Sequence, residues 1–143
     1  MDSFTDSNQS AITRAWATLR IGGPDLDPDL ATRVLQIQPT AEPLRRPGLR
    51  PTTDARRRLS FWRLSTKDIL TSVQLEDHLK WILTCLAGAR GRLDSLVPGA
   101  TQTDVFCYLR GPGGGGPTIS ASTLNRLGEL GLSLGLDIYL QSI

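Results

Sequence analysis

The sequence predicts an α+β domain with a ferredoxin-like α/β sandwich, in which a four-stranded, mainly antiparallel sheet carries its helices on one face. Three observations support this prediction. Four short segments alternate apolar and polar residues, which is the period of a half-buried strand. Leucines recur at helical spacing between these segments. A strand, a Gly/Pro turn and a helix N-cap also follow one another twice, which indicates two similar halves.

The first half begins with an alternating segment at residues 15–21, which predicts a strand with two different faces. A Gly/Pro turn at residues 22–24 ends this strand. Asp27 then provides the N-cap of a short helix over residues 30–35. Residues 59–64 alternate again and predict the second strand.

A leucine-rich stripe from Leu75 to Leu93 predicts the middle helix, with Thr71 and Gln74 at capping-box spacing before it. The second half repeats the first. A strand over residues 105–109 leads into a Gly/Pro turn, and the remaining elements are an N-cap at Ser120, a helix over residues 124–132 and a strand over residues 134–140.

The predicted order is therefore strand, helix, strand, helix, strand, helix, strand. If the first three and the last three elements form the two halves, each half is a split βαβ unit and the middle helix joins them. Right-handed crossovers then place the helices on one face of the sheet. A strictly parallel sheet is the alternative, but it fits less well because strands covered on both faces read as continuous aliphatic runs.

Several short motifs lie in the predicted turns, strand ends and helix starts. In chain order they are Gly23-Pro24-Asp25-Leu26-Asp27-Pro28, Ile37-Gln38-Pro39-Thr40, Trp62-Arg63-Leu64-Ser65, Leu75-Glu76-Asp77-His78-Leu79, Gly116 to Ser120, and Asp137-Ile138-Tyr139. With these motifs the chain resembles the bacterial domain of unknown function 4279 family over roughly residues 13 to 140. The resemblance implies a fold and a bacterial, cytoplasmic protein, and it implies no particular reaction.

The chain departs from the family pattern at two positions. Gln36 stands where the family has a glycine before Ile37, and Ala121 stands where it has a proline after Ser120. Glutamine and alanine are both good helix formers, so we expect neither substitution to disrupt a helix.

Length and composition favour one domain. The 143 residues fit a disordered tail over residues 1–10 and a single domain over residues 11–143. No apolar stretch approaches the roughly 20 residues that cross a membrane, and the polar start does not resemble a secretory signal. Cys85 and Cys107 lie in apolar periodic segments, so we expect reduced thiols and a cytoplasmic location.

Residues 38–58 form an Arg/Pro-rich segment, which we expect to be an irregular loop because regularly spaced prolines remove backbone donors. Its arginines are Arg45, Arg46, Arg50, Arg56, Arg57 and Arg58. This basic loop is interpreted first as a solvated loop, second as a surface for an acidic protein and last as a nucleic-acid contact. The net charge of +2 is too small to favour nucleic acid.

The predicted sheet has one face without helices, and its aromatic and charged residues form the candidate interaction surface. These residues are Trp16, Arg20, Trp62, Phe106, Tyr108, Asp137 and Tyr139. We expect the basic loop or a second copy of the chain to cover this face, and a partner or ligand surface is the other interpretation. Base stacking is disfavoured because no complete ribonucleoprotein motif is present.

No complete catalytic or metal-binding set is recognisable. His78 is the only histidine and lacks an identifiable nucleophile, so we interpret it as a helix-surface or half-buried structural residue. Residues 25–29 alternate aspartates without the rest of a calcium loop. The glycine run at residues 113–116 lacks the lysine of a phosphate loop and is interpreted as a flexible loop. No metal and no cofactor are expected.

Two functions remain open. We favour a non-enzymatic protein-interaction module, for instance an immunity-type protein that neutralises a toxin partner. The alternative is a regulatory or sensing domain whose sheet face or glycine loop binds a small anionic ligand. A homodimer is compatible with both, whereas an enzyme is a distant third.

Overall fold

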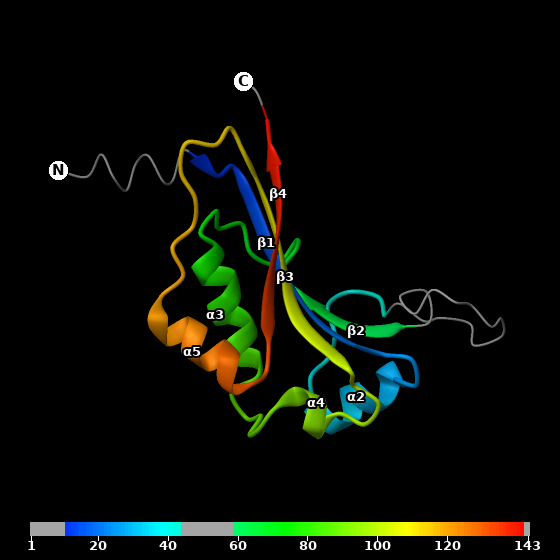
Figure 1. The fold of residues 1–143 in the computed structure, drawn as a ribbon. Helices are drawn as coiled ribbons and strands as arrows, with labels where there is room; N and C mark the ends of the chain where they lie inside the picture. Colours follow the sequence, from blue (N-terminus) through cyan, green and yellow to red (C-terminus); the bar gives the residue numbers. More distant parts are fainter. Residues whose placement is uncertain (1–10, 44–58, 142–143) are drawn as a thin grey trace.

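The computed structural model describes residues 11–43 and 59–141, which form one mixed sheet and four helices (Figure 1). Helices α3 and α5 cover one face of the sheet, and α2 and α4 lie at one end of it. Within these residues no helix is both long and apolar enough to cross a membrane. The elements are β1 (Arg14–Gly23), α2 (Pro28–Leu35), β2 (Ser60–Ser65), α3 (Leu75–Cys85), α4 (Leu93–Leu96), β3 (Gln102–Gly111), α5 (Ala121–Glu129) and β4 (Ser133–Leu140).

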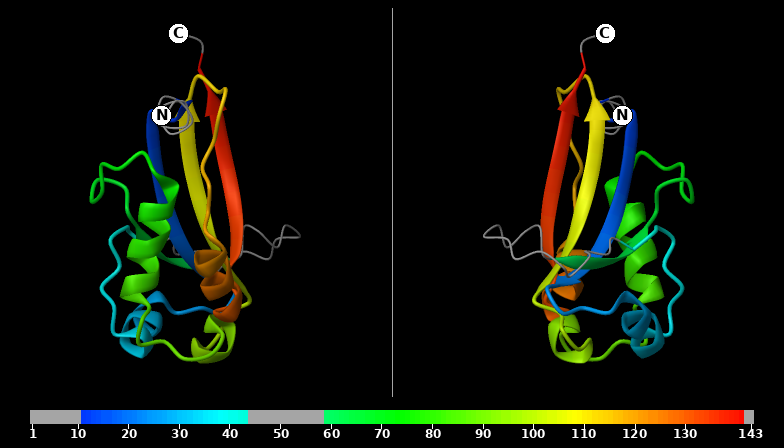
Figure 2. Two further views of the ribbon diagram at one scale, coloured as in Figure 1. Left: turned by 90° about the vertical axis from the view of Figure 1, so that its left-hand side faces the viewer. Right: turned by 90° about the vertical axis from the view of Figure 1, so that its right-hand side faces the viewer.

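The sheet order is β2-β1-β3-β4. Strand β1 pairs antiparallel with both β2 and β3, whereas β3 and β4 are parallel neighbours. Figure 2 shows the three long strands side by side, with β4 at the margin of the sheet. The predicted α+β class and the four-stranded sheet with helices on one face are therefore confirmed in their coarse features.

The two split βαβ units of the ferredoxin-like prediction are not formed. In a split unit, the strands that flank a helix are parallel and have a third strand between them. Here β3 and β4 are direct neighbours, and β1 and β2 are antiparallel neighbours. The long connection from α2 to β2 gives the chain room to return antiparallel, so the first half needs no crossover.

The predicted middle helix is two helices. Helix α3 ends at Cys85, and Gly91, with φ of +94°, lies in the turn before α4. Leu93 begins α4 and is still fully buried. The leucine stripe therefore does face the core, but it spans two helices that are separated by a turn.

The repeated strand, turn and N-cap arrangement is present in both halves. The Oδ1 atom of Asp27 accepts a hydrogen bond from the N–H of Asp29 at 3.0 Å. The Ser120 hydroxyl accepts one from the N–H of Thr123 at 3.2 Å. The capping box expected before α3 is absent, because the Gln74 side chain makes no cap bond and Ser72 accepts from the Gln74 N–H instead.

The core lies between the sheet and the helices. Alternate residues of β1 and β3 point into it, and α3 covers them with three fully buried apolar side chains, Leu75, Leu79 and Ile82. At the end of β1, a side-chain carbon on Gly23 would collide with the carbonyl oxygen of Gly99. Only glycine fits this approach, which holds the β1 turn against the segment that leads into β3.

His78 is completely buried, and the expectation of a surface or half-buried residue is wrong in this respect. Its Nε2 lies 2.7 Å from the carbonyl oxygen of Ser72, so in the neutral ring Nε2 carries the proton. Its Nδ1 lies 2.5 Å from the Thr66 hydroxyl, and that oxygen also accepts from the N–H of Ala17 at 3.0 Å. This buried network joins α3, the end of β2 and the middle of β1.

Replacement of Thr66 by valine should destabilise the fold, because it leaves two buried polar groups, Ala17 N–H and His78 Nδ1, without a partner. A buried group that loses its partner costs about 1–3 kcal/mol. Thr66→Ser keeps the hydroxyl and loses one methyl, at about 1 kcal/mol. Urea unfolding should show that Val lowers the free energy of unfolding clearly more than Ser. A valine variant as stable as the wild type would exclude a structural role for this network.

Gln36 ends α2 with a left-handed backbone, φ of 58° and ψ of 38°, and its N–H donates to the Thr32 carbonyl. A side chain disfavours this conformation by about 1–2 kcal/mol, and the resemblance noted above places a glycine at the same position. Gln36→Gly should therefore raise the free energy of unfolding by about 1 kcal/mol, net of the greater freedom of glycine in the unfolded chain. Gln36→Ala keeps a side chain in the left-handed conformation and should not raise the free energy of unfolding. Equal effects of Gly and Ala in chemical unfolding would contradict this explanation.

Candidate functional site

The face of the sheet opposite the helices, hereafter the open face, gathers six of the residues expected at the interaction surface. They are Trp16, Arg20, Phe106, Tyr108, Asp137 and Tyr139. The strand register brings them together, since Trp16 lies opposite Tyr108 and Tyr108 lies opposite Asp137. The right-hand view of Figure 2 looks toward this face, where the strands lie in front of the helices.

Three aromatic rings from three strands form a continuous row across the open face. The rings of Trp16 and Tyr108 are stacked, with centroids 3.9 Å apart and planes 9° from parallel. Tyr139 continues the row, with its centroid 5.2 Å from that of Tyr108. Stacking of this kind stabilises each pair by about 0.5–1.5 kcal/mol beyond the burial of area, so the row holds a defined shape.

Two basic side chains lie close to the Trp16 end of this aromatic row. The guanidinium carbon of Arg14 is 4.9 Å from the Trp16 ring centroid, and the Lys67 ammonium is 4.8 Å from it. Both distances suit cation–π attraction. Neither residue was predicted from the sequence. Arg14 precedes Trp16 by two positions and therefore shares its strand face, but no periodicity marks Lys67, which lies beyond β2.

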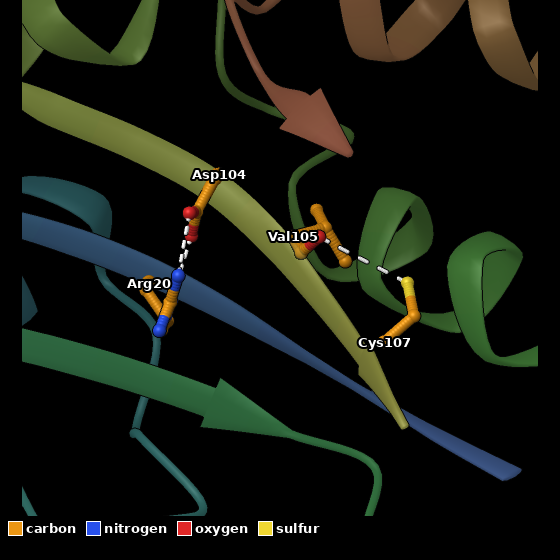
Figure 3. A network of polar contacts seen from close by, with 4 residues as sticks. All are labelled: Arg20, Asp104, Val105 and Cys107. Atoms are coloured by element: carbon orange, nitrogen blue, oxygen red, sulfur yellow. Dashed lines mark hydrogen bonds and ion pairs between the residues drawn. The ribbon is translucent and has the colours of Figure 1, made fainter. Parts of the chain in front are cut away.

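Arg20 and Asp104 form a two-point ion pair between β1 and β3 (Figure 3). The Nε–Oδ1 and Nη2–Oδ2 distances are 2.8 Å and 2.6 Å. The hydrogen bond to Asp104 and the Asp104 charge outweigh the effect of burial and raise the pKa of Arg20. The guanidinium lies 4.7 Å from the Phe106 ring centroid and 5.8 Å from that of Phe61. The pair thus fixes Arg20 between two aromatic rings.

Trp62 does not belong to the open face, which corrects the sequence expectation. It is fully buried on the helix side, and its indole N–H donates to the Thr32 hydroxyl at 2.9 Å. Phe61 takes the place on the open face that Trp62 was expected to take. The spacing contained the signal, because Trp62 is two residues from Leu64 and therefore shares its core-facing side.

The charge on the open face is predominantly positive at its exposed positions. Asp104 is engaged by Arg20, whereas Arg14 and Lys67 are exposed. Arg110 lies on the same face, and its Nε is buried without a hydrogen-bond partner among the described residues. At the Tyr139 end, a hydrogen bond to Asp137 and then the Asp137 charge raise the pKa of the Tyr139 hydroxyl. That hydroxyl therefore remains a neutral donor at physiological pH.

A hollow of about 220 Å³ lies beside the Trp16 end of the row. Its lining includes Thr13, Arg14, Trp16, Lys67 and Asp68. Two cations, one carboxylate and an indole ring line this small recess, so its positive excess and its ring could hold an anionic or aromatic group. This recess borders the open face at the Trp16 end of the row.

The glycine run does not offer a free helix N-terminus to an anion. Gly113 and Gly114 have φ of +88° and +87°, and the chain then leads to the N-cap of α5. The carboxylate of Glu76 on α3 accepts from the N–H of Ser120 at 3.2 Å and 3.3 Å. An acidic side chain of the protein itself thus occupies the position that a bound anion would take.

The remaining sequence candidates do not add a reactive centre. The basic loop residues Arg45, Arg46, Arg50, Arg56, Arg57 and Arg58 lie outside the described residues. Both cysteines are free, and burial first and the Asp104 charge second raise the pKa of the Cys107 thiol to about 12. Figure 3 shows this thiol beside the Val105 carbonyl, 3.9 Å away. In the described part of the chain, no three potential metal ligands lie together.

A family model described as Domain of unknown function (DUF4279) matches residues 11–141. No curated protein and no solved structure matches the chain significantly. The match covers all the described elements from β1 to β4, so the open face lies within it.

The contact between Glu76 and Ser120 predicts a pH effect on stability. Partial burial raises the pKa of Glu76, but hydrogen bonds from Ser120 and Thr123 and the charge of Lys80 outweigh burial, so the pKa lies below its ordinary value of 4.5. Ionised Glu76 therefore favours folding at neutral pH, and this contribution is lost as the pH falls through the lowered pKa.

Denaturant unfolding at several pH values should detect this contribution. Between about pH 5 and pH 3, the free energy of unfolding should fall more steeply for the wild type than for Glu76→Gln, which has no charge to lose. Parallel curves for the two proteins would show that the carboxylate does not favour the folded state.

Proposed function

Because the chain belongs to the domain of unknown function 4279 family, to which no activity is attached, we propose from its surface that it is a non-enzymatic protein-interaction module of the bacterial cytoplasm. Its open face binds an acidic surface of another protein. The observation that carries this proposal is the aromatic row of Trp16, Tyr108 and Tyr139 with cations at one end. An immunity-type protein that neutralises a toxin is one form of such a module.

The residue types and their fixed positions favour protein binding. Tryptophan, tyrosine and arginine supply most of the binding energy at protein interfaces. Stacked rings lose little further side-chain freedom when a partner binds, so less of the interaction energy is offset by ordering. Tyr139 leaves 48% of its surface exposed at the end of the row, where it is accessible to a partner.

The exposed charge favours an acidic partner. Arg14 and Lys67 are accessible beside Trp16 and outnumber the one carboxylate of the adjoining hollow, Asp68, and further along the face Asp104 is already paired with Arg20. Complementary charge raises the association rate and makes binding sensitive to salt. We therefore expect the complex to dissociate more readily at high ionic strength.

The buried titratable groups support a non-enzymatic role. Both ring nitrogens of His78 are engaged inside the core, so neither faces a substrate. The Cys107 thiol is buried and protonated, and a protonated thiol is a poor nucleophile. The free cysteines are also compatible with a reducing compartment.

The hollow beside Trp16 supports a second candidate function, a sensing domain that binds a small anionic ligand. Arg14 and Lys67 would supply the positive charge and Trp16 an apolar wall. Thermal unfolding in the presence of phosphate or citrate tests this candidate, because a ligand that binds only the folded state raises the transition temperature. A shift that Arg14→Glu abolishes would favour ligand binding.

Affinity capture from a lysate of the source organism tests the interaction module. The full chain should retain an acidic protein that is lost on salt elution and is not retained by the Arg14→Glu, Lys67→Glu double variant. Tyr139→Ala should weaken capture without changing the fold. The matched control is Arg33→Glu, Arg90→Glu, which reverses two exposed charges outside the open face and should capture the partner normally.

Each variant must first give the wild-type circular dichroism spectrum and a similar unfolding midpoint. Equal capture by both charge-reversed proteins would remove the open face from consideration as the binding surface. Capture of no protein by the wild type, together with a phosphate or citrate shift, would favour the sensing domain instead.

A further inference from the structure

Strand β4 forms an open edge of the sheet with large apolar side chains exposed along it. Leu136, Ile138 and Leu140 are 50%, 55% and 72% exposed, and Tyr139 on the other side of the strand is 48% exposed. These four residues are consecutive except for Asp137. The side of β4 that faces the helices is apolar, the other side carries one charge, Asp137, and the strand contains no lysine or proline, so it lacks most of the usual protection against pairing with another strand.

The backbone of β4 also directs hydrogen-bonding groups away from the sheet. The N–H of Gln141 donates to the carbonyl of Gly111 at 2.9 Å. Since bonding alternates along a parallel strand, the odd-numbered residues of β4 bond to β3 and the even-numbered residues face outward. Leu136, Ile138 and Leu140 therefore present both N–H and C=O at the open edge. In the described chain, no backbone hydrogen bond joins these groups to another element.

The opposite edge of the sheet is treated differently. Beside β2, the Thr40 hydroxyl accepts from the N–H of Ser65 at 2.6 Å and lies 2.5 Å from the Ser65 carbonyl oxygen. The Arg63 guanidinium donates to the backbone carbonyl of Glu42 at 2.9 Å. Thr40 and Glu42 thus cover the Ser65 end of that edge, and β4 has no equivalent cover in the described residues.

We propose that β4 pairs antiparallel with β4 of a second copy of the chain, about a two-fold axis at Ile138. Outward-facing backbone groups then meet in hydrogen-bonded pairs, with Ile138 opposite Ile138 and Leu136 opposite Leu140 of the second copy. The two sheets become one continuous sheet.

The side chains of β4 favour a second copy as the occupant and favour this register. A two-fold axis at Ile138 places aliphatic residues opposite aliphatic residues, and it places Asp137 opposite Tyr139, so that no like charges face each other. A shift of the axis by one residue to Asp137 would place two carboxylates directly opposite each other, which destabilises a strand pair. The interface is therefore self-complementary in one register, as two-fold symmetry requires.

This dimer shares Asp137 and Tyr139 with the border of the open face, lies otherwise outside the surface assigned to the protein partner, and extends the proposed function. A two-fold axis perpendicular to the sheet keeps both open faces on the same side. Because a single strand pair buries less than the ~1,200–2,000 Å² of a standard stable interface, we expect a dissociation constant in the micromolar range.

Analytical ultracentrifugation of the full chain, from low to high micromolar concentration, tests the pairing. The wild type should shift from monomer to dimer across this range. Ile138→Lys should remain monomeric, or dimerise at least about tenfold more weakly, whereas Ile69→Lys, at a residue that is 44% exposed beyond β2, should behave as the wild type. Ile138→Pro removes only an outward N–H, which an edge strand tolerates, and should also be monomeric.

A cross-link tests the register independently. The two-fold axis brings residue 138 against its own copy, within the separation that a disulfide bridges. Mild oxidation should therefore join Ile138→Cys chains into a covalent dimer, while Ile69→Cys chains and the wild type stay monomeric. A wild type that remains monomeric throughout, or a dimer that persists in both Ile138→Lys and Ile138→Pro, would overturn the proposal.

Discussion

The Thr66 hydroxyl is the point at which the main parts of the molecule are joined. This hydroxyl contacts His78 of α3 and the backbone of Ala17 in β1, and Thr66 itself immediately follows β2. This contact fixes α3 against the middle of the covered face of the sheet. It also directs the next residue, Lys67, toward Trp16 on the opposite side. One buried hydroxyl therefore couples the packing of the core to the charge of the open face.

Local pattern predicted much of this fold, because strand alternation and helix capping act over a few residues. The alternation around Trp16 and Tyr108 identified their common face, and Asp27 and Ser120 marked two helix starts correctly. The strand order could not be obtained in this way. It depends on which strands pair with one another, and both the ferredoxin-like order and the observed order are compatible with the same alternation. The break after Cys85 was also hidden, since Leu93 continues the apolar stripe into the core.

The candidate surface was predictable in its aromatic residues and less so in its charges. Parity along β1 and β3 indicates which rings share a face, and the same argument correctly applied to Leu64 would have placed Trp62 in the core. Lys67 reaches Trp16 through tertiary contact alone. The ion pair of Arg20 and Asp104 is likewise a product of register, because 84 positions separate the two residues in sequence. This pair holds the guanidinium between the rings of Phe61 and Phe106.

The unequal treatment of the two sheet edges has a consequence for the size of any assembly. A chain with two unpaired sheet edges can add a further chain at each edge and form a fibre. Here Thr40 binds both outward backbone groups of Ser65 at the end of β2, so a strand added there would have to displace bonds that already exist. Pairing through β4 occupies the edge that is uncovered in the described residues, so growth stops at two chains. The protection of β2 is thus what separates a limited assembly from an aggregate.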